Sequence, residues 1–100
     1  MKPTIEIITD IVAQEYFVSR EDIFSRKRTQ SVSDARQVIM YIAHKYLYMP
    51  YAEIAEYVGR SYNTTRYGIR MVKDRYLFDR GFFQKLNRIK DKVKDKVKDI

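Results

Sequence analysis

Apolar residues recur at steps of three and four along most of this chain, and this period constrains the fold more than any other feature. The first stripe consists of Ile5, Ile8, Val12 and Tyr16. A 3.6-residue period places these side chains on one face, so the stripe predicts a helix from about Thr4 to Phe17. Hydrophobic residues make up 45% of the chain, with only three Gly and two Pro, which disfavours disorder and loop-rich β folds. We therefore expect a compact all-α domain of five or six helices.

The middle of the chain predicts one short and one long helix. A capping arrangement that begins at Ser19 favours a short helical turn. The polar and basic segment Ser25–Ser31 lacks apolar periodicity, which indicates an exposed loop. Helical spacing returns from Val32 to Tyr48, with Ser31 or Ser33 as the expected N-cap. Pro50 ends this long helix.

Three further helices are expected in the second half. Tyr51–Val58 is a short amphipathic segment, and Gly59 after it suits the left-handed conformation that ends helices. Ser61 can cap a helix from Tyr62 to about Leu77. A last helix is expected from Phe82 onward. Its narrow apolar stripe is Leu86, Ile89, Val93 and Val97, and its lysine-rich end is expected to fray into solvent.

Positive charge gathers on the helix predicted after Ser61. The chain has a formal net charge of +7, and residues 59–73 contain four basic and no acidic side chains. Arg66, Arg70 and Lys73 share the outer face of this helix, and Thr65, Ile69, Val72 and Tyr76 share its inner face. Phosphate binding requires positive charge on one surface, so this segment is the first candidate for a nucleic-acid site.

A short helix, a turn with Gly59 and a second helix with a basic outer face form the pattern of a helix-turn-helix. In that motif the first turn of the second helix reaches base edges in the major groove. Here the turn carries Ser61, Tyr62, Asn63 and Thr64. Asn can pair with adenine, hydroxyls bond several base edges, and a Thr methyl or Tyr ring can meet a thymine methyl. We expect these four residues to contact bases at a site that contains A·T pairs.

The order of several motifs resembles the C-terminal DNA-binding domain of the bacterial replication initiator DnaA over residues 5 to about 90. The motifs are Val12-Ala13 before Tyr16, Asp22-Ile23 with Ser25 and Arg28, Ala35-Arg36-Gln37 before Met40-Tyr41, and Glu53-Ile54. The resemblance implies a fold like that of the Trp repressor. The turn signature of the family is Gly-Gly-Arg-Asp-His-Ser/Thr-Thr, and here Val58 to Thr65 reads Val-Gly-Arg-Ser-Tyr-Asn-Thr-Thr.

Two registers are possible across this altered signature. If one family glycine is missing, Ser61, Tyr62 and Asn63 occupy the Asp, His and Ser/Thr positions. If none is missing, the two Thr-Thr pairs coincide, and Arg66 and Lys73 would point into the core. We prefer the first register because an unpaired buried cation costs several kcal/mol.

The resemblance also implies contacts outside the helix-turn-helix. Arg28 in the basic loop would enter the minor groove, where narrow A·T tracts attract guanidinium groups. Phosphate contacts are expected from the residues that surround these two points: Arg26, Lys27, Arg36, Gln37, His44, Arg60, Thr65, Arg66 and Arg70. We assign the remaining tyrosines to packing. These are Tyr16, Tyr41, Tyr46, Tyr48, Tyr51, Tyr57, Tyr67 and Tyr76.

An enzyme is disfavoured. The chain has no G-x-x-x-x-G-K-S/T phosphate loop, no cysteine and a single histidine, so we expect no catalytic residue, no metal and no cofactor. The expected partner is double-stranded DNA, with neither a membrane nor a small-molecule substrate, and a monomer is favoured. A cytoplasmic, nucleoid-associated protein is expected. Because the chain starts with Met1 and carries its own tail, a freestanding DnaA-like protein is preferred to an excised domain.

The expected function is sequence-specific binding of duplex DNA in replication initiation or its control, without ATPase activity. Residues 1–90 would form the domain and residues 91–100 a charged helical tail. The alternatives are a transcription regulator of a phage or mobile element, and a protein-interaction module that has lost DNA binding. Attachment of the lysine-rich tail to RNA or an acidic membrane would also explain the charge. Truncation after Arg80 is expected to separate such tail binding from duplex binding.

Overall fold

Six α-helices and no strand make up residues 4–98, the part of the chain that this computed structural model describes, without the side chains of residues 97 and 98. The helices are α1 (Ile5–Tyr16), α2 (Arg20–Phe24), α3 (Gln30–Leu47), α4 (Tyr51–Val58), α5 (Tyr62–Phe78) and α6 (Arg80–Lys98). The expected all-α class is confirmed. None of these helices is both long and apolar enough to cross a membrane.

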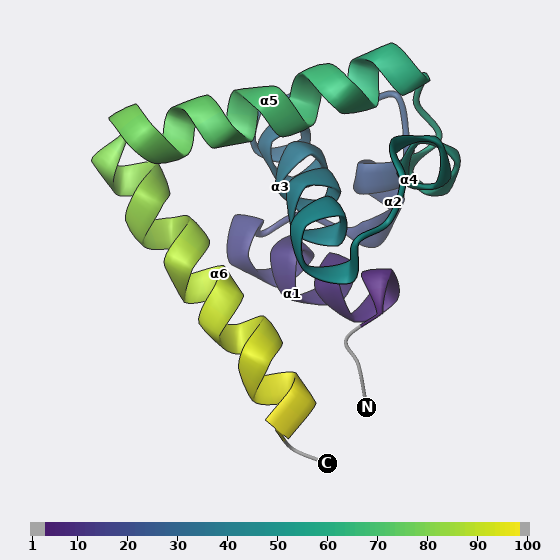
Figure 1. Cartoon of the computed structure of the whole chain (residues 1–100). Coiled ribbons are helices and arrows are strands. Elements are labelled where there is room, and N and C mark those ends of the chain that lie inside the picture. Colours follow the sequence, from purple (N-terminus) through teal and green to yellow (C-terminus); the bar gives the residue numbers. More distant parts are fainter. Residues whose placement is uncertain (1–3, 99–100) are drawn as a thin grey trace.

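The long helix α3 forms the centre of the molecule, with α1 and α5 packed against it (Figure 1). Its apolar side chains from Val32 to Ala43 are almost fully buried. Gly68 brings α5 close to α3, since a Cβ at this position would lie only 3.0 Å from the Met40 sulfur and 3.2 Å from Cγ of Gln37. The orientation of α5 is therefore set by its contact with α3.

Two of the N-cap residues predicted from the sequence are observed in the structure, and a third is not. Ser19 Oγ accepts a hydrogen bond from the Asp22 amide at 3.0 Å, and Ser61 Oγ accepts one from the Thr64 amide at 3.1 Å. The N-cap expected for the long helix is wrong. Thr29 is the N-cap of α3, so Ser31 and Ser33 lie within its first turn and the basic loop is shortened to residues 25–29. Three closely spaced hydroxyl residues all suit a cap, so local preference could not choose among them.

Left-handed residues end three helices. Gly59, with φ 70°, ends α4 as the sequence predicts. Phe17 and Tyr48 end α1 and α3 in the same conformation, each with φ 55°. A residue with a Cβ is disfavoured there by roughly 1–2 kcal/mol. The sequence marks the end of α1 only by the loss of apolar spacing, and the end of α3 also by Pro50.

The last helix is more firmly docked than the sequence suggests. Asp79 Oδ1 accepts a hydrogen bond from the Phe82 amide at 3.0 Å, so α6 begins two residues earlier than expected. Instead of leaving the core, α6 folds back from α5 along α1 (Figure 1). The buried side chains of α6 are Phe82, Leu86, Ile89 and Val93. The helix is continuous across residues 90 and 91, and the side chain of Val97 lies outside the described part.

A pair of cations on α6 joins this helix to α1. Glu15 accepts hydrogen bonds from Arg88 Nε at 2.7 Å and from Lys92 Nζ at 3.0 Å, and its side chain is 13% exposed. These two hydrogen bonds lower the pKa of the Glu15 carboxyl against the opposing effect of burial. The stabilisation is present above the pKa of the unfolded chain and is lost as the pH falls through the lowered folded-state value.

Because α6 completes the core, truncation after Arg80 would remove four buried side chains and cannot separate a tail function from DNA binding. The Leu86→Ala substitution should lower the free energy of unfolding by about 3 kcal/mol, since it leaves a cavity beside α1 and α5. Urea unfolding followed by circular dichroism measures this loss. As a control, Lys94→Ala on the exposed face should change stability by less than about 0.5 kcal/mol. Equal stability of both variants would contradict the docking of α6.

Candidate nucleic-acid interface

The helix α5 divides into a buried and an exposed face. Thr65, Gly68, Ile69 and Val72 are buried, and this face contacts α3. Arg66, Arg70 and Lys73 are exposed. The burial pattern is the one that the preferred register requires, and the register that buries Arg66 and Lys73 is wrong. The cations of α5 are therefore free to meet an external anion.

The first turn of α5 holds the residues that were expected to contact bases. Ser61 Oγ donates to Thr64 Oγ1 at 2.9 Å besides capping the helix, so the Ser61 proton is already used, whereas Thr64 keeps its own O–H to donate. Tyr62 is 49% exposed and its ring meets that of Tyr51 edge-on at 5.8 Å. Asn63 is exposed beside them. Of the four, Asn63 is the best placed to offer both a donor and an acceptor.

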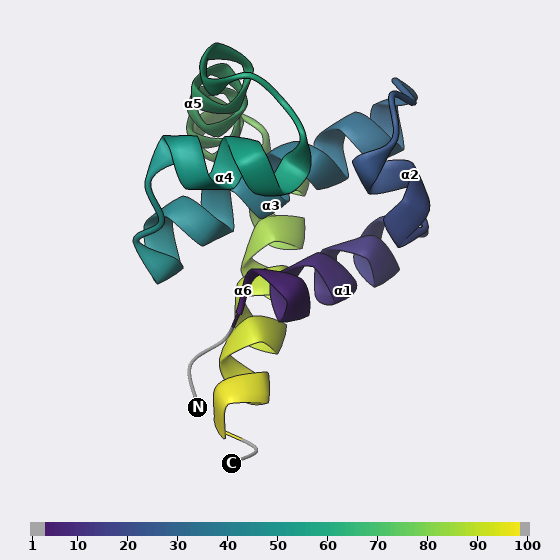
Figure 2. The same cartoon turned by 90° about the vertical axis from the view of Figure 1, so that its right-hand side faces the viewer.

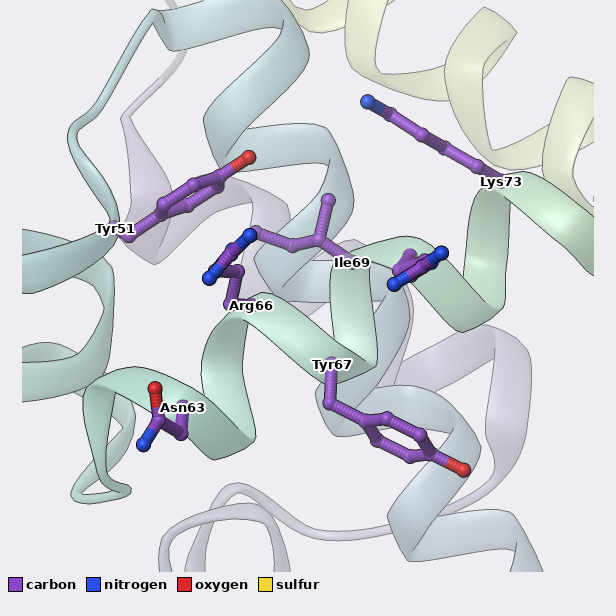
Figure 3. A pocket seen from close by; sticks show the side chains of 7 residues that line it. Tyr51, Asn63, Arg66, Tyr67, Ile69 and Lys73 are labelled. Carbon is purple, nitrogen blue, oxygen red and sulfur yellow. The ribbon is translucent and has the colours of Figure 1, made fainter.

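A cationic hollow of about 520 Å³ lies on the α4 side of α5 (Figure 3). It is lined by Tyr51, Asn63, Arg66, Tyr67, Ile69, Arg70 and Lys73, none of them acidic. Figure 3 shows the Arg66 side chain extending towards Tyr51. Tyr51 and Lys73 are additions to the expected contact residues. The charge pattern already pointed to Lys73, but only the packing of α4 on α5 brings Tyr51 into the hollow.

A second hollow, of about 540 Å³, lies on the other side of α5 and faces the basic loop. Its lining residues are Arg28, Ser33, Arg36, Gln37, Met40, Arg60, Thr64 and Tyr67. In Figure 2 the loop between α2 and α3 and the start of α5 lie along the same upper edge of the molecule. A smaller hollow continues between them and adds Arg26 and Ser61. Arg28 and the first turn of α5 therefore belong to one surface, as the resemblance implies.

Arg36 holds the basic loop in place from inside. Arg36 is only 6% exposed, and its Nε donates to the Ile23 carbonyl at 2.8 Å. Its Nη2 lies 3.1–3.3 Å from three further carbonyl oxygens, those of Asp22, Ser25 and Lys27. Two of its three guanidinium nitrogens are thus engaged with the backbone. The structure gives Arg36 a positioning role in place of the phosphate contact expected from the sequence.

Arg60 reaches the same loop from the helix-turn-helix. Its Nη2 donates to the Ser25 carbonyl at 2.6 Å, and its Nη1 donates to the Gly59 carbonyl at 3.1 Å. Two guanidinium groups therefore converge on the Ser25 carbonyl. Burial and then the charge of Arg60 lower the pKa of Arg36. This shared contact at the Ser25 carbonyl connects the turn before α5 to the loop that carries Arg28.

The other expected phosphate contacts occupy different environments. Thr65 is fully buried, so its side chain cannot reach a phosphate and that prediction is wrong. Lys27 is exposed, and its Nζ lies 3.4 Å from Oδ2 of Asp22. Gln37 is partly buried and lines the second hollow. His44 is partly buried behind Tyr51, on which its ring stacks at 4.5 Å, and its Nδ1 donates to the Met49 carbonyl at 3.0 Å.

Two of the tyrosines assigned to packing are largely exposed. Tyr48 is 86% exposed at the end of α3, and Tyr67 is 60% exposed between the two hollows. Apolar spacing could not identify Tyr67 as a surface residue, because aromatic residues are common on both the core and the rim of a helix. The assignment to packing is wrong for both residues.

Taken together, a short helix, a glycine turn and a second helix with an exposed cationic face define a DNA-binding helix-turn-helix domain. The family model described as "Bacterial dnaA protein helix-turn-helix" matches residues 5–72. The chain belongs to this family, and the resemblance noted in the sequence is confirmed.

Several proteins named "Chromosomal replication initiator protein DnaA" are similar to this chain. The protein from Desulfotalea psychrophila is 32% identical over 87 residues, which is 87% of this chain and 18% of that protein. The protein from Brucella abortus is 34% identical over 87 residues, and the protein from Nostoc sp. is 28% identical over 94 residues. The shares are 86% of this chain and 18% of the Brucella protein, and 93% of this chain and 20% of the Nostoc protein. The chain thus spans about a fifth of the length of these relatives.

Arg36→Ala should lower the free energy of unfolding by about 2–3 kcal/mol, because it leaves several loop carbonyls without their charged donor. Arg36→Lys should restore little of this, since one ammonium cannot span the carbonyls that the planar guanidinium reaches. Urea unfolding gives the loss. The exposed Arg66→Ala variant is the matched control and should keep the stability of the parent chain. Full stability in Arg36→Lys would argue against the positioning role.

Thr65→Val should raise the free energy of unfolding by about 1 kcal/mol, because a buried hydroxyl without a partner carries a desolvation cost. Within the described part of the chain, Thr65 Oγ1 is the one buried side-chain oxygen or nitrogen that lacks a hydrogen bond. Thermal unfolding of the two proteins provides the comparison. A lower melting temperature for the valine variant would mean that the hydroxyl has a partner after all.

Proposed function

We propose that this chain binds double-stranded DNA at a specific sequence, with α5 in the major groove and the basic loop in the adjacent minor groove. The observation that supports this most strongly is the position of the exposed Asn63 on a helix flanked by two cationic hollows without acidic lining residues. Phosphate contacts orient a protein on the duplex, and a side chain between them reads the bases. This chain offers both kinds of group on one surface.

The dimensions of the motif suit the major groove. An α-helix with its side chains is about 10–12 Å across, and the major groove of B-DNA is about 12 Å wide. With α5 in the groove, the hollow beside α4 would take phosphates of one backbone through Arg66, Arg70 and Lys73. The hollow beside the loop would take the backbone that separates the two grooves, through Arg60 and Gln37.

The basic loop supports the minor-groove contact. Arg26, Lys27 and Arg28 are all exposed, and Arg28 lines both hollows on this side of α5. A narrow minor groove over A·T pairs has an enhanced negative potential that attracts a guanidinium group. We assign the minor-groove contact to Arg28 and phosphate contacts to Arg26 and Lys27. His44, whose ring stacks on that of Tyr51, is assigned a further phosphate contact.

The role that follows is replication initiation or its control, because the relatives of the chain are named replication initiators. We further propose that this chain contributes by binding alone. No phosphate loop for a nucleotide occurs in its sequence. Selection of bound duplexes from a random library tests specificity directly, and enrichment of one A·T-containing sequence is the expected result.

Asn63→Ala should weaken binding to the selected sequence by about 1–3 kcal/mol, the range for one bidentate base contact. Binding to random duplex should change little, so discrimination should flatten at one or two positions. Fluorescence anisotropy with the selected duplex and single-base variants measures both effects.

The matched control for Asn63→Ala is Arg70→Ala. Loss of a phosphate contact should weaken binding to all sequences alike and reduce the salt slope by about one counterion. If Asn63→Ala instead lowered the affinity for every duplex equally, the assignment of Asn63 to a base would be wrong. If the library showed no enrichment at all, sequence-specific binding itself would be refuted.

A further inference from the structure

Tyr67 has a position on α5 that packing does not explain. Its side chain is 60% exposed, and within the described part of the chain no hydrogen bond or aromatic contact engages it. It also lines both cationic hollows. In Figure 3, Tyr67 leaves the helix on the side away from Arg66 and Tyr51. Tyr67 therefore lies on the ridge that separates the two hollows.

The helical period places this ridge on the DNA-facing side of α5. Tyr67 follows Asn63 by four residues, so the two share one face of the helix. The face is opposite to Ile69 and Val72, which are each 1% exposed. Two turns beyond Tyr67, the exposed Asp74 would be repelled by phosphates, so the inserted part of α5 ends before it.

The charges on either side of the ridge indicate what Tyr67 would face. A groove of DNA is bounded by two phosphate backbones, and each cationic hollow can hold one of them. A side chain between the hollows then points to the floor of the groove, where the base edges lie. Tyr67 carries no charge, whereas Arg66 and Arg70 next to it already supply the cations that a backbone requires. An apolar ring at this place suits an apolar base edge.

We propose that Tyr67 is a specificity-determining residue whose ring contacts the C5-methyl group of a thymine in the major groove. Among the base edges exposed there, the thymine methyl is the apolar one. Residues four apart lie about 6 Å apart along a helix axis. At about 3.4 Å per base pair, the thymine lies within about two steps of the base read by Asn63. The inference rests on the proposed function, because it requires α5 to occupy the major groove.

The test replaces each thymine of the selected duplex in turn by deoxyuridine, which removes only the methyl group. The parent protein should lose about threefold to fivefold in affinity at one of these positions, the amount expected for one buried methyl. Tyr67→Ala should bind the unmodified duplex more weakly and should not respond to deoxyuridine at that position. Tyr67→Phe keeps the ring and should behave like the parent protein. Fluorescence anisotropy supplies the dissociation constants.

Tyr46→Ala serves as a control, since Tyr46 lies near Lys90 of α6 and not at the hollows. It should keep the deoxyuridine response of the parent protein. A selected sequence that is bound by Tyr67→Ala with the full deoxyuridine profile would overturn the inference and leave the proposed function intact. A uniform loss on all duplexes in Tyr67→Ala, or a loss in Tyr67→Phe as large as in Tyr67→Ala, would indicate a phosphate contact and also overturn it. Absence of any selected sequence for the parent protein would overturn both.

Discussion

The contact between α3 and α5 is the constraint on which the rest of the structure depends. Gly68 allows the two helices to approach until a Cβ would touch Met40 and Gln37. With Ile69 and Val72 held against the core, the opposite face of α5 can only point outward. The exposure of Asn63 and of the α5 cations follows from this contact, as does the position of Tyr67 on the ridge between the hollows. A change at the contact would move the whole DNA-facing surface.

The second determinant is the meeting of Arg36 and Arg60 at the Ser25 carbonyl. Among the residues that the structure describes, no carboxylate compensates this pair of cations; backbone carbonyl oxygens take the guanidinium hydrogens instead. Charged donors to carbonyls are stronger than neutral ones, but two nearby cations also repel each other. The pKa of Arg36 is lowered by its burial and then by this repulsion. Because one cation comes from α3 and the other from the turn before α5, the loop cannot move independently of the recognition helix. The distance between the two proposed groove contacts is thereby set.

Much of the local structure could be predicted from particular residues. Apolar spacing located five of the six helices in the described part of the chain, the capping arrangement at Ser19 located α2, and Ser61 and Gly59 marked two further boundaries correctly. The predictions failed where several residues were equally suitable, as at the start of α3, or where packing overrode composition. The apolar stripe of α6 was identified, but the lysine-rich composition around it predicted fraying, whereas the stripe is buried up to Val93. A helix whose surface is mostly charged can still pack on the core through one narrow apolar stripe.

The sequence by itself determined the helical class, the cationic character of residues 59–73 and the presence of Asn63 in the first turn of α5, since these depend on neighbours a few positions away. Only the tertiary structure decided which polar groups are free to bind. Arg36 is occupied by carbonyls 9–14 residues away and Thr65 is enclosed by the core, whereas Arg60 donates to a carbonyl 35 residues away and still lines the hollow that faces the loop. Tyr67 differs from the core tyrosines only in what packs beside it. Hydrogen bonding and burial are long-range outcomes of packing, and the identity of a side chain does not specify them.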